Sequence, residues 1–512
     1  MPADASPATV RPAPALPGHR RAPPWVRLLP LPGFLLYGMV LAFLVGGYAG
    51  GSDSSGYLNN ARLLAAGRYT AAQRLVPGLA PESLPPYTHV PLGFIPNPDH
   101  VTMTPTYPVG LSLLFAGAAL LVGWSLAPPF VLVAHALAGL TLVYHVGRRA
   151  GLDATWAWLG TLLLACSPVY LMMSLQAMSD VPAMVWVTAA VLAAWRSRER
   201  TWLAPVAGVA FSLAVLIRPT DLLAFAPVAL ALGGSRRRWT LFVLGCLPGA
   251  FFQGAFNFAT YGRILITGYG YVNPEFRWAH VLPALEAYVR WLPVLLTPLG
   301  LLALGLPWLG RDAPRPTALL TTWALVFPIF YLPYSHTHDD WGNLRFLLPA
   351  FPALLVGALL VARRWAGRWT AARSWWLAPA ALAILLHGAA WSRHLHAYTV
   401  GRGEKVYPLT SAWMQAHLPP DSVIAAMQVS GSLLYYTRFT FIRWDMMSAA
   451  DFQRIAAASA AAGRPVYAVL FPYEVEDPAW DAFGRHLPGH WTQVGAVRQV
   501  RIWRLDTPAA AP

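Results

Sequence analysis

Charged residues are scarce in this chain, where they make up 12% of the 512 residues while 56% are hydrophobic. That charged share is about half of what is usual in a soluble globular protein. A soluble fold of this size could not cover so much apolar surface with so few charges. Disorder of the whole chain is excluded for the opposite reason, because there is ample apolar surface to bury. These exclusions leave a polytopic membrane protein.

Cysteine and lysine are also nearly absent. The two cysteines, Cys166 and Cys246, lie inside apolar runs, which excludes a disulfide framework and a cysteine zinc site. Lys405 is the only lysine, so the net charge of +15 comes from arginines, many of which sit in short clusters between apolar blocks. Membrane topology explains this pattern better than a nucleic-acid partner does.

What is abundant is apolar sequence, in blocks near the length of a spanning helix, which is about 20 residues. The candidate blocks are 28–47, 107–124, 128–147, 156–176, 181–195, 202–217, 221–234, 239–259, 284–309, 317–333, 344–361 and 374–392. Arginine clusters follow alternate blocks and predict that those ends are cytoplasmic. Block 107–124 has no charge at either end and breaks the alternation, so we expect a re-entrant or peripheral segment. The prediction is an α-helical membrane protein with about eleven crossings, its N-terminus inside and its C-terminus outside.

Three parts of the chain fall outside these blocks. Residues 1–24, rich in Pro and Ala, predict a disordered cytoplasmic tail that precedes a membrane module over 25–394. An outer loop, 48–106, is too long for a simple connection. Residues 395–512 predict a small extracytoplasmic α/β domain. Its expected elements are strands at 423–427, 466–471 and 497–503 and a helix at 449–462.

Acidic residues at the outer membrane boundary are the first candidates for function, because burying an ionisable group there is costly. Asp53 follows the first apolar block, and Asp180 lies in a short turn between two later blocks. Either could instead be a helix N-cap, which satisfies free backbone N–H groups. A cap alone does not explain an aspartate at the membrane boundary beside a long outer loop.

Cations and histidines on the same side are the second group of candidates. Arg218, Arg263 and Arg345 are predicted to face outward, although arginines at such positions also extend to lipid headgroups. Residues 335–340, Ser-His-Thr-His-Asp-Asp, allow a divalent metal site through His338 and Asp339, with His336 beside them. Their spacing is equally compatible with simple solvation. No cofactor is certain, and no nucleotide-binding motif is present.

Several short motifs, taken in order, resemble the GT-C superfamily of membrane glycosyltransferases, in particular the bacterial relatives of protein O-mannosyltransferases and the lipid A aminoarabinose transferase. The motifs are Ser52-Asp53-Ser54-Ser55-Gly56-Tyr57, Pro105-Thr106-Tyr107-Pro108, Tyr144-His145-Val146-Gly147-Arg148-Arg149, Ser179-Asp180-Val181-Pro182, Arg218-Pro219-Thr220, residues 257–270 and Arg345-Phe346-Leu347-Leu348-Pro349. No single motif is specific, but their order and spacing cover most of residues 28–392.

This resemblance implies an inverting transfer of a sugar from a polyprenyl phosphate to an acceptor outside the plasma membrane. By position, Asp53 would be the general base on the acceptor hydroxyl, and Asp180 would position the acceptor or an arginine. Arg345, with Arg263 or Arg218, would bind the donor phosphate. Residues expected to line the substrate site are Tyr57, Arg62, Tyr107, Tyr261, Tyr269, His336 and His338.

One departure from the family bears on the acceptor. The family's protein mannosyltransferases have paired acidic residues after the first helix, whereas this chain has Asp53 alone. A glycan or lipid acceptor is therefore favoured over a protein acceptor.

The main alternative is a transporter or a flippase for lipid-linked glycans, which also needs many helices and charges within the membrane. Transporters usually contain internal repeats with paired broken helices. The two halves of this chain show no convincing repeat, and transport does not need a soluble outer domain. The sequence therefore favours a transferase.

Overall fold

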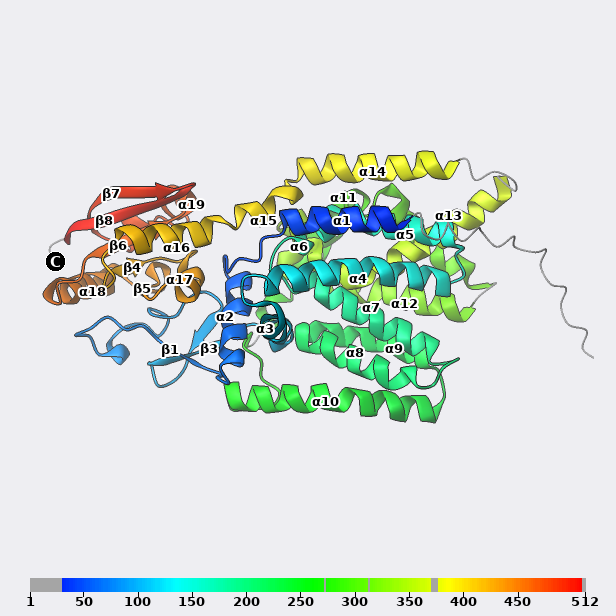
Figure 1. The fold of residues 1–512 in the computed structure, drawn as a ribbon, viewed down its shortest axis with the longest axis horizontal. Coiled ribbons are helices and arrows are strands. Elements are labelled where there is room, and N and C mark those ends of the chain that lie inside the picture. The colour runs from blue at the N-terminus through cyan, green and yellow to red at the C-terminus, as the bar shows by residue number, and fades with distance from the viewer. Residues whose placement is uncertain (1–29, 271–272, 312–313, 370–375, 509–512) are drawn as a thin grey trace, which may run out of the picture.

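The structure is elongated, with a helical part at one end and a smaller α/β part at the other (Figure 1). This computed structural model describes residues 30–270, 273–311, 314–369 and 376–508. The predicted disordered tail, residues 1–24, lies outside the described residues.

The helical part consists of apolar helices that run mainly along the long axis of the molecule (Figure 1). They are α1 (Pro30–Leu44), α4 (Ala127–Arg149), α5 (Ala154–Ala165), α6 (Pro168–Ser174), α7 (Asp180–Arg196), α8 (Leu203–Ile217), α9 (Phe225–Leu232), α10 (Arg236–Tyr261), α11 (Val281–Leu295), α12 (Pro314–Tyr331), α13 (Phe351–Trp369) and α14 (Leu377–His394). Short 3-10 segments join them, among them η3 (Pro219–Ala224), η6 (Pro298–Arg311), η7 (Ser335–His338) and η8 (Trp341–Ala350). One continuous apolar core, centred on α4, α7, α8, α12 and α13, holds these helices together.

By length and composition, three of the described helices can cross a membrane, or up to five if each bent pair counts as one span. The prediction of a mainly helical membrane protein is confirmed at this level. Several predicted blocks appear as shorter apolar helices, and the count of about eleven crossings remains a proposal.

Two blocks that the sequence presents as continuous are sharply bent. The block 156–176 divides into α5 and α6 at an angle of 65°, and the block 284–309 divides into α11 and η6 at 111°. A proline, Pro168 or Pro298, starts the second half in each case. Proline has no N–H to continue the helical hydrogen bonds, which explains why the chain turns there.

The predicted outer loop is folded. It contains α2 (Asp53–Ala65) and the strands β1 (Ala71–Ala72), β2 (Phe94–Pro96) and β3 (Thr102–Pro105), which form an antiparallel sheet in the order β1-β3-β2. Helix α2 runs across the long axis, between the two parts of the molecule (Figure 1). The segment predicted to be re-entrant or peripheral forms α3 (Val109–Val122), which packs against α2, α4 and α8.

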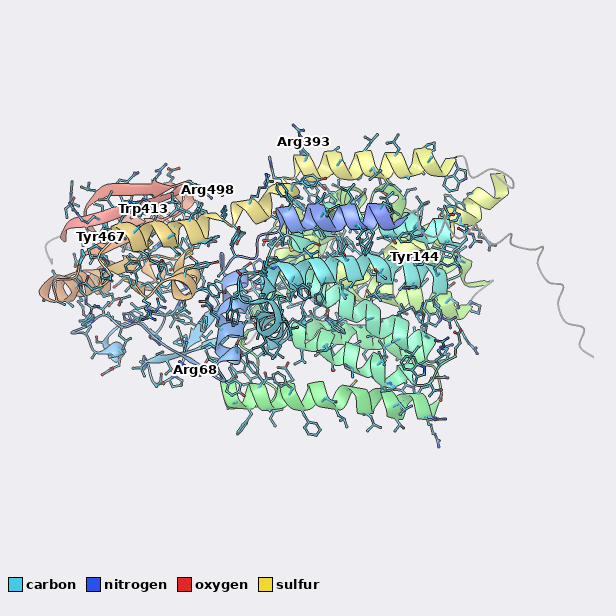
Figure 2. The ribbon with its side chains drawn as sticks, viewed as in Figure 1. Arg68, Tyr144, Arg393, Trp413, Tyr467 and Arg498 are labelled. Carbon is cyan, nitrogen blue, oxygen red and sulfur yellow. The ribbon has the colours of Figure 1, made fainter. Side chains whose placement is uncertain are left out.

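The C-terminal part is a five-stranded mixed sheet with helices, as predicted in outline. Its elements are α15 (Val400–Gly403), α16 (Val406–His417), β4 (Val423–Ala425), α17 (Ser430–Tyr436), β5 (Thr440–Ile442), α18 (Ala449–Ala461), β6 (Val466–Leu470), α19 (Pro472–Glu476), α20 (Ala482–Arg485), β7 (Gly489–Val497) and β8 (Val500–Pro508). The strand order is β5-β4-β6-β8-β7, in which β4 runs parallel to β5 and β6, and β8 runs antiparallel to β6 and β7. Trp413, Tyr467 and Arg498 mark this end of the molecule, and Tyr144 marks the opposite half (Figure 2).

The outer loop and the C-terminal part share a core. Val76 and Leu84 of the loop pack in one apolar cluster with residues of β4, β6 and α18. Backbone hydrogen bonds reinforce this contact, since Arg443 N donates to the Thr88 carbonyl at 2.7 Å. The two segments predicted to lie outside the membrane therefore form one body beside α2.

Candidate active site

Two aspartates and two arginines from distant parts of the sequence meet where α2 contacts the helical part. Asp53 is the first residue of α2, and Asp180 is the first residue of α7. Arg218 ends α8, and Arg345 lies in η8. We call these four residues the charged cluster.

Ion pairs join the four side chains. Arg345 Nη2 lies 3.2 Å from Asp53 Oδ2, and Arg345 Nε lies 4.0 Å from Asp180 Oδ1. Arg218 pairs directly with Asp180 through Nη1. Arg345 thus contacts both aspartates, which brings together the acidic pair and two of the three arginines that the sequence singled out.

Both aspartates lie in the first turn of a helix, but this position does not explain why they pair with arginines. In each helix a serine, Ser52 or Ser179, occupies the N-cap position, and neither serine caps through its side chain. The positive end of a helix dipole stabilises a carboxylate in the first turn. Asp53 and Asp180 are thus the first residues of their helices and not the N-caps. Their carboxylates pair with arginines instead.

The two aspartates differ in exposure. The Asp180 side chain is 2% exposed, whereas that of Asp53 is 29% exposed and that of Arg345 is 22% exposed. A molecule that approaches the cluster can reach Asp53 and Arg345, while Asp180 stays buried behind them. A buried carboxylate needs a partner to offset its desolvation, and Arg218 provides it.

One aromatic ring contacts both arginines of the cluster. Phe346 lies under both arginines, with its ring centre 5.2 Å from the Arg218 guanidinium carbon and 5.3 Å from that of Arg345. This cation–π contact helps to hold two like charges close together. Phe346 was not among the predicted site residues, although its position next to Arg345 was a usable signal.

The tyrosines predicted to bind substrate partly gather at this place. Tyr107 lies 5.0 Å from Tyr57 and 6.1 Å from Tyr269, measured between ring centres. The Tyr107 hydroxyl shares a 2.7 Å hydrogen bond with Ser52 Oγ and faces Asp53. The Tyr261 hydroxyl donates to the Pro105 carbonyl at 2.9 Å, two residues before Tyr107.

Two other predicted site residues, Arg263 and Arg62, take no part in the ion pairs of the charged cluster. Arg263 is exposed in the segment after α10. Arg62 contacts the C-terminal part, where it donates to the Tyr435 carbonyl at 2.6 Å and stacks on the Tyr435 ring at 3.5 Å. This contact ties α2 to α17, which the sequence could not reveal because the partner is far along the chain.

The histidines predicted as substrate or metal ligands lie in η7, next to η8. His336 Nδ1 is 2.7 Å from Asp339 Oδ2, and His338 Nε2 is 3.1 Å from His280 Nδ1. Within the described part of the chain, no three His, Cys, Asp or Glu side chains are grouped to hold a metal ion. The metal site at His338 and Asp339 stays a prediction.

Glu404, which was not among the predicted site residues, comes from the connection between α15 and α16. Its carboxylate lies against Gly50, since a Cβ added to Gly50 would be 1.8 Å from Glu404 Oε2. Burial and the nearby Asp53 raise the pKa of Glu404 to about 7. A third carboxylate therefore packs against the segment that leads into Asp53.

Comparison with known proteins agrees with this architecture. Residues 130–245 match the sequence model of the dolichyl-phosphate-mannose-protein mannosyltransferase family. A comparison with curated protein sequences gives no match.

Solved structures match over nearly the whole chain. ArnT from Cupriavidus metallidurans bound to undecaprenyl phosphate is similar at 12% identity and a TM-score of 0.55, covering 94% of this chain and 98% of that chain. The oligosaccharyltransferase of Archaeoglobus fulgidus in its apo form is similar at 12% identity and a TM-score of 0.51, covering 90% of this chain and 71% of that one. The resemblance to GT-C enzymes is thus supported in two ways: residues 130–245 match the mannosyltransferase family model, and the fold of the chain is similar to that of ArnT.

Proposed function

We propose that the protein transfers a sugar from a polyprenyl phosphate to a hydroxyl of a glycan, lipid or protein acceptor on the outer face of the membrane. The charged cluster carries this proposal, because it combines a reachable carboxylate with two arginines at one place. The ArnT structure bound to undecaprenyl phosphate supports a donor of this class.

The reaction requires a proton acceptor beside the attacking hydroxyl and positive charge beside the leaving phosphate. We propose that Asp53 accepts the proton as the acceptor oxygen attacks the anomeric carbon, with inversion. The bond between the anomeric carbon and the phosphate oxygen breaks as the new bond forms, and Arg345 binds the phosphate that leaves.

The ion pair between Asp53 and Arg345 suggests how the site changes when the donor binds. A donor phosphate that binds Arg345 replaces Asp53 as its partner and leaves the carboxylate free for the acceptor hydroxyl. Arg218 remains paired with the buried Asp180, so it supplies fixed positive charge behind Arg345. On this proposal Asp180 positions the arginines and does not touch the substrate.

The amphiphilic donor fits the location of the cluster. Its prenyl chain needs a lipid environment, and its sugar phosphate needs a polar one. The cluster lies where apolar helices meet the folded outer loop, which provides both. We propose that this end of the molecule faces outward and that the N-terminus is cytoplasmic, in agreement with the positions of the arginine clusters.

Asp53→Asn tests the proposal directly. The amide keeps the shape of the side chain but cannot accept the proton, so we expect the transfer rate to fall by about 10²- to 10⁴-fold. The measurement is transfer of radiolabelled sugar from a polyprenyl-phosphate donor to acceptors in a cell-envelope extract, by the purified full chain in lipid vesicles.

Asp421→Asn, at an exposed position in the C-terminal part, is the matched control and should keep full activity. Normal transfer by folded Asp53→Asn would disprove the role of Asp53. Movement of the intact donor across the vesicle membrane, without sugar release, would instead indicate a flippase.

A further inference from the structure

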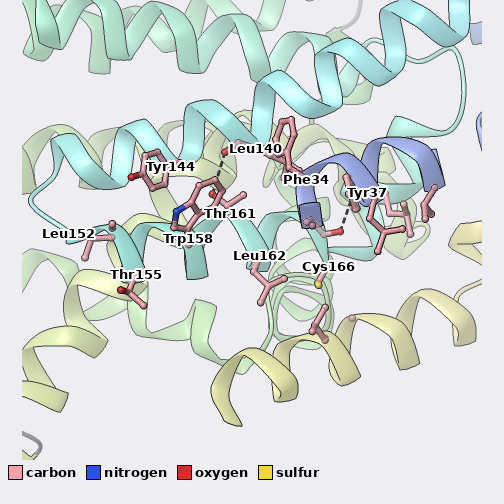
Figure 3. A pocket seen from close by; sticks show the side chains of 18 of the residues that line it. Phe34, Tyr37, Leu140, Tyr144, Leu152, Thr155, Trp158, Thr161, Leu162 and Cys166 are labelled. Atoms are coloured by element: carbon pink, nitrogen blue, oxygen red, sulfur yellow. Dashed lines mark hydrogen bonds between the residues drawn. The ribbon is translucent and has the colours of Figure 1, made fainter. Parts of the chain in front are cut away.

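A large hollow lies away from the charged cluster, between α1, α4, α5 and α14. Its volume is about 1730 Å³, which exceeds the range of about 300–1,000 Å³ typical of small-molecule sites. Figure 3 shows the side chains that line it, with Tyr144 and Trp158 toward one end and Tyr37 and Cys166 toward the other. We call it the α1/α14 groove.

The walls of the groove are apolar. Leu36 and Val40 of α1, Leu162 of α5 and Leu385 of α14 line it. Two of its polar side chains are satisfied within the protein: Thr161 Oγ1 donates to the Leu140 carbonyl at 3.3 Å, and Tyr37 OH donates to the Ala165 carbonyl at 3.2 Å (Figure 3). A ligand in this part of the groove would therefore contact hydrocarbon walls.

One end of the groove is charged. Arg148 and Arg363 line it together with Asp153. Arg148 donates to the Leu152 carbonyl at 3.0 Å, Arg363 donates to the Gly151 carbonyl at 2.6 Å, and Arg363 Nε lies 3.9 Å from Asp153 Oδ2. Asp153 also caps α5 by accepting from Thr155 N. Two positive charges and one negative charge leave this end with a net charge of +1, although each arginine already has a backbone partner.

We propose that the α1/α14 groove binds one anionic phospholipid, with its two acyl chains along the apolar walls and its phosphate between Arg148 and Arg363. The net charge of this end complements a single phosphate. Basic residues between transmembrane helices, at the level of the headgroups, are a recurring site for anionic lipids.

The position of the charged end of the groove distinguishes the proposed phospholipid from the prenyl donor. Tyr144, one turn before Arg148 on α4, lies in the half of the helical part far from the C-terminal part, whereas Arg393 lies at the near end of α14 (Figure 2). The phosphate-binding end of the groove is thus at the opposite end of the helices from Asp53 and Arg345. A donor held there could not present its sugar to the charged cluster.

Native mass spectrometry of the purified full chain tests this proposal. The chain is mixed in mild detergent with equal amounts of phosphatidylglycerol and phosphatidylcholine, and the bound lipid is counted. We expect one tightly held lipid with a preference for phosphatidylglycerol. Arg148→Gln and Arg363→Gln should each lower that preference about fivefold, as expected for one arginine near an anionic lipid. Ala389→Trp, within the groove, should lower the binding of both lipids.

Two matched variants serve as controls. Arg237→Gln removes an exposed arginine outside the groove, and Ala390→Trp adds the same bulk at the next exposed position of α14, so both should bind lipid as the unchanged chain does. Equal lipid preference in all the arginine variants would overturn the proposal. So would displacement of phosphatidylglycerol by undecaprenyl phosphate that depends on Arg148, because the groove would then belong to a prenyl phosphate. Neither readout requires transferase activity.

Discussion

At the scale of single residues, exposure separates the roles of two aspartates that look alike in the sequence. Asp53 and Asp180 each begin a helix, and each pairs with an arginine. Asp53 can be reached by a substrate, whereas Asp180 is buried against Arg218. A buried pair contributes little net stability, but breaking it is costly because one charge is left without a partner. We therefore expect a change at Asp180 to affect the stability of the folded protein before it affects the reaction itself.

Asp180→Asn should lower the free energy of unfolding by about 3 kcal/mol, because Arg218 loses its charged partner. The double variant Asp180→Asn/Arg218→Gln should recover part of this loss, since it removes the uncompensated charge as well. Thermal unfolding in detergent measures both, with Asp421→Asn as the exposed control. A double variant less stable than the single one would contradict this account.

At the scale of elements, the position of α2 depends on close contacts with the C-terminal part. Asn59 Nδ2 donates to the Gly431 carbonyl at 2.9 Å, and Ala49 N donates to the Tyr436 hydroxyl at 2.9 Å. Gly50 fits against Glu404 and the ring of Tyr407 with no space for a side chain. Helix α17 and the connection before α16 thus hold the segment that leads into Asp53.

Gly50→Ala should shift this segment, because the new Cβ would lie 1.8 Å from Glu404 Oε2 and 2.6 Å from the Tyr407 ring. A displacement of about 1 Å at a catalytic group can cost up to about 10²-fold in rate, and we expect transferase activity to fall within that range. Gly117→Ala in α3 is the matched control, since no heavy atom lies within 4 Å of the added Cβ. Unchanged activity of Gly50→Ala would show that these contacts do not position Asp53.

At the scale of the whole molecule, the junction between its two parts contains a carboxyl group that prefers to be neutral. Burial, together with Asp53, raises the pKa of Glu404 from 4.5 to about 7, and Oε2 has no hydrogen-bond partner among the described residues. The folded protein therefore holds a proton that the unfolded chain releases above its own pKa. The resulting stabilisation is complete below pH 4.5 and is lost as the pH rises through about 7.

Glu404→Gln should remove this dependence, because the amide stays neutral. Between pH 5 and pH 8, the unchanged chain should lose about 2–3 kcal/mol of unfolding free energy relative to Glu404→Gln. Denaturation at several pH values measures the difference, and Glu474, whose pKa burial also raises to about 7, is present in both proteins and cancels. Parallel pH profiles would contradict the prediction.

Local pattern alone was enough for much of the secondary structure. The predicted strand at 466–471 appears as β6, and the predicted Ala-rich helix at 449–462 appears as α18 with a Ser448 capping box. Both depend on neighbours in the chain, which the sequence shows directly. The bends after α5 and α11 were missed, because an apolar run with a proline can either continue or turn.

Composition and the order of short motifs indicate the membrane class, the small C-terminal α/β part and the candidate aspartates and arginines, since these depend on local hydrophobicity and charge. The tertiary structure decided which charges meet. Arg345 pairs with Asp53 and approaches Asp180, whereas Arg62 stacks on Tyr435 and Glu404 packs against Gly50. Each of these contacts joins segments far apart in the chain, and their distances follow from helix packing and burial, which no local pattern encodes.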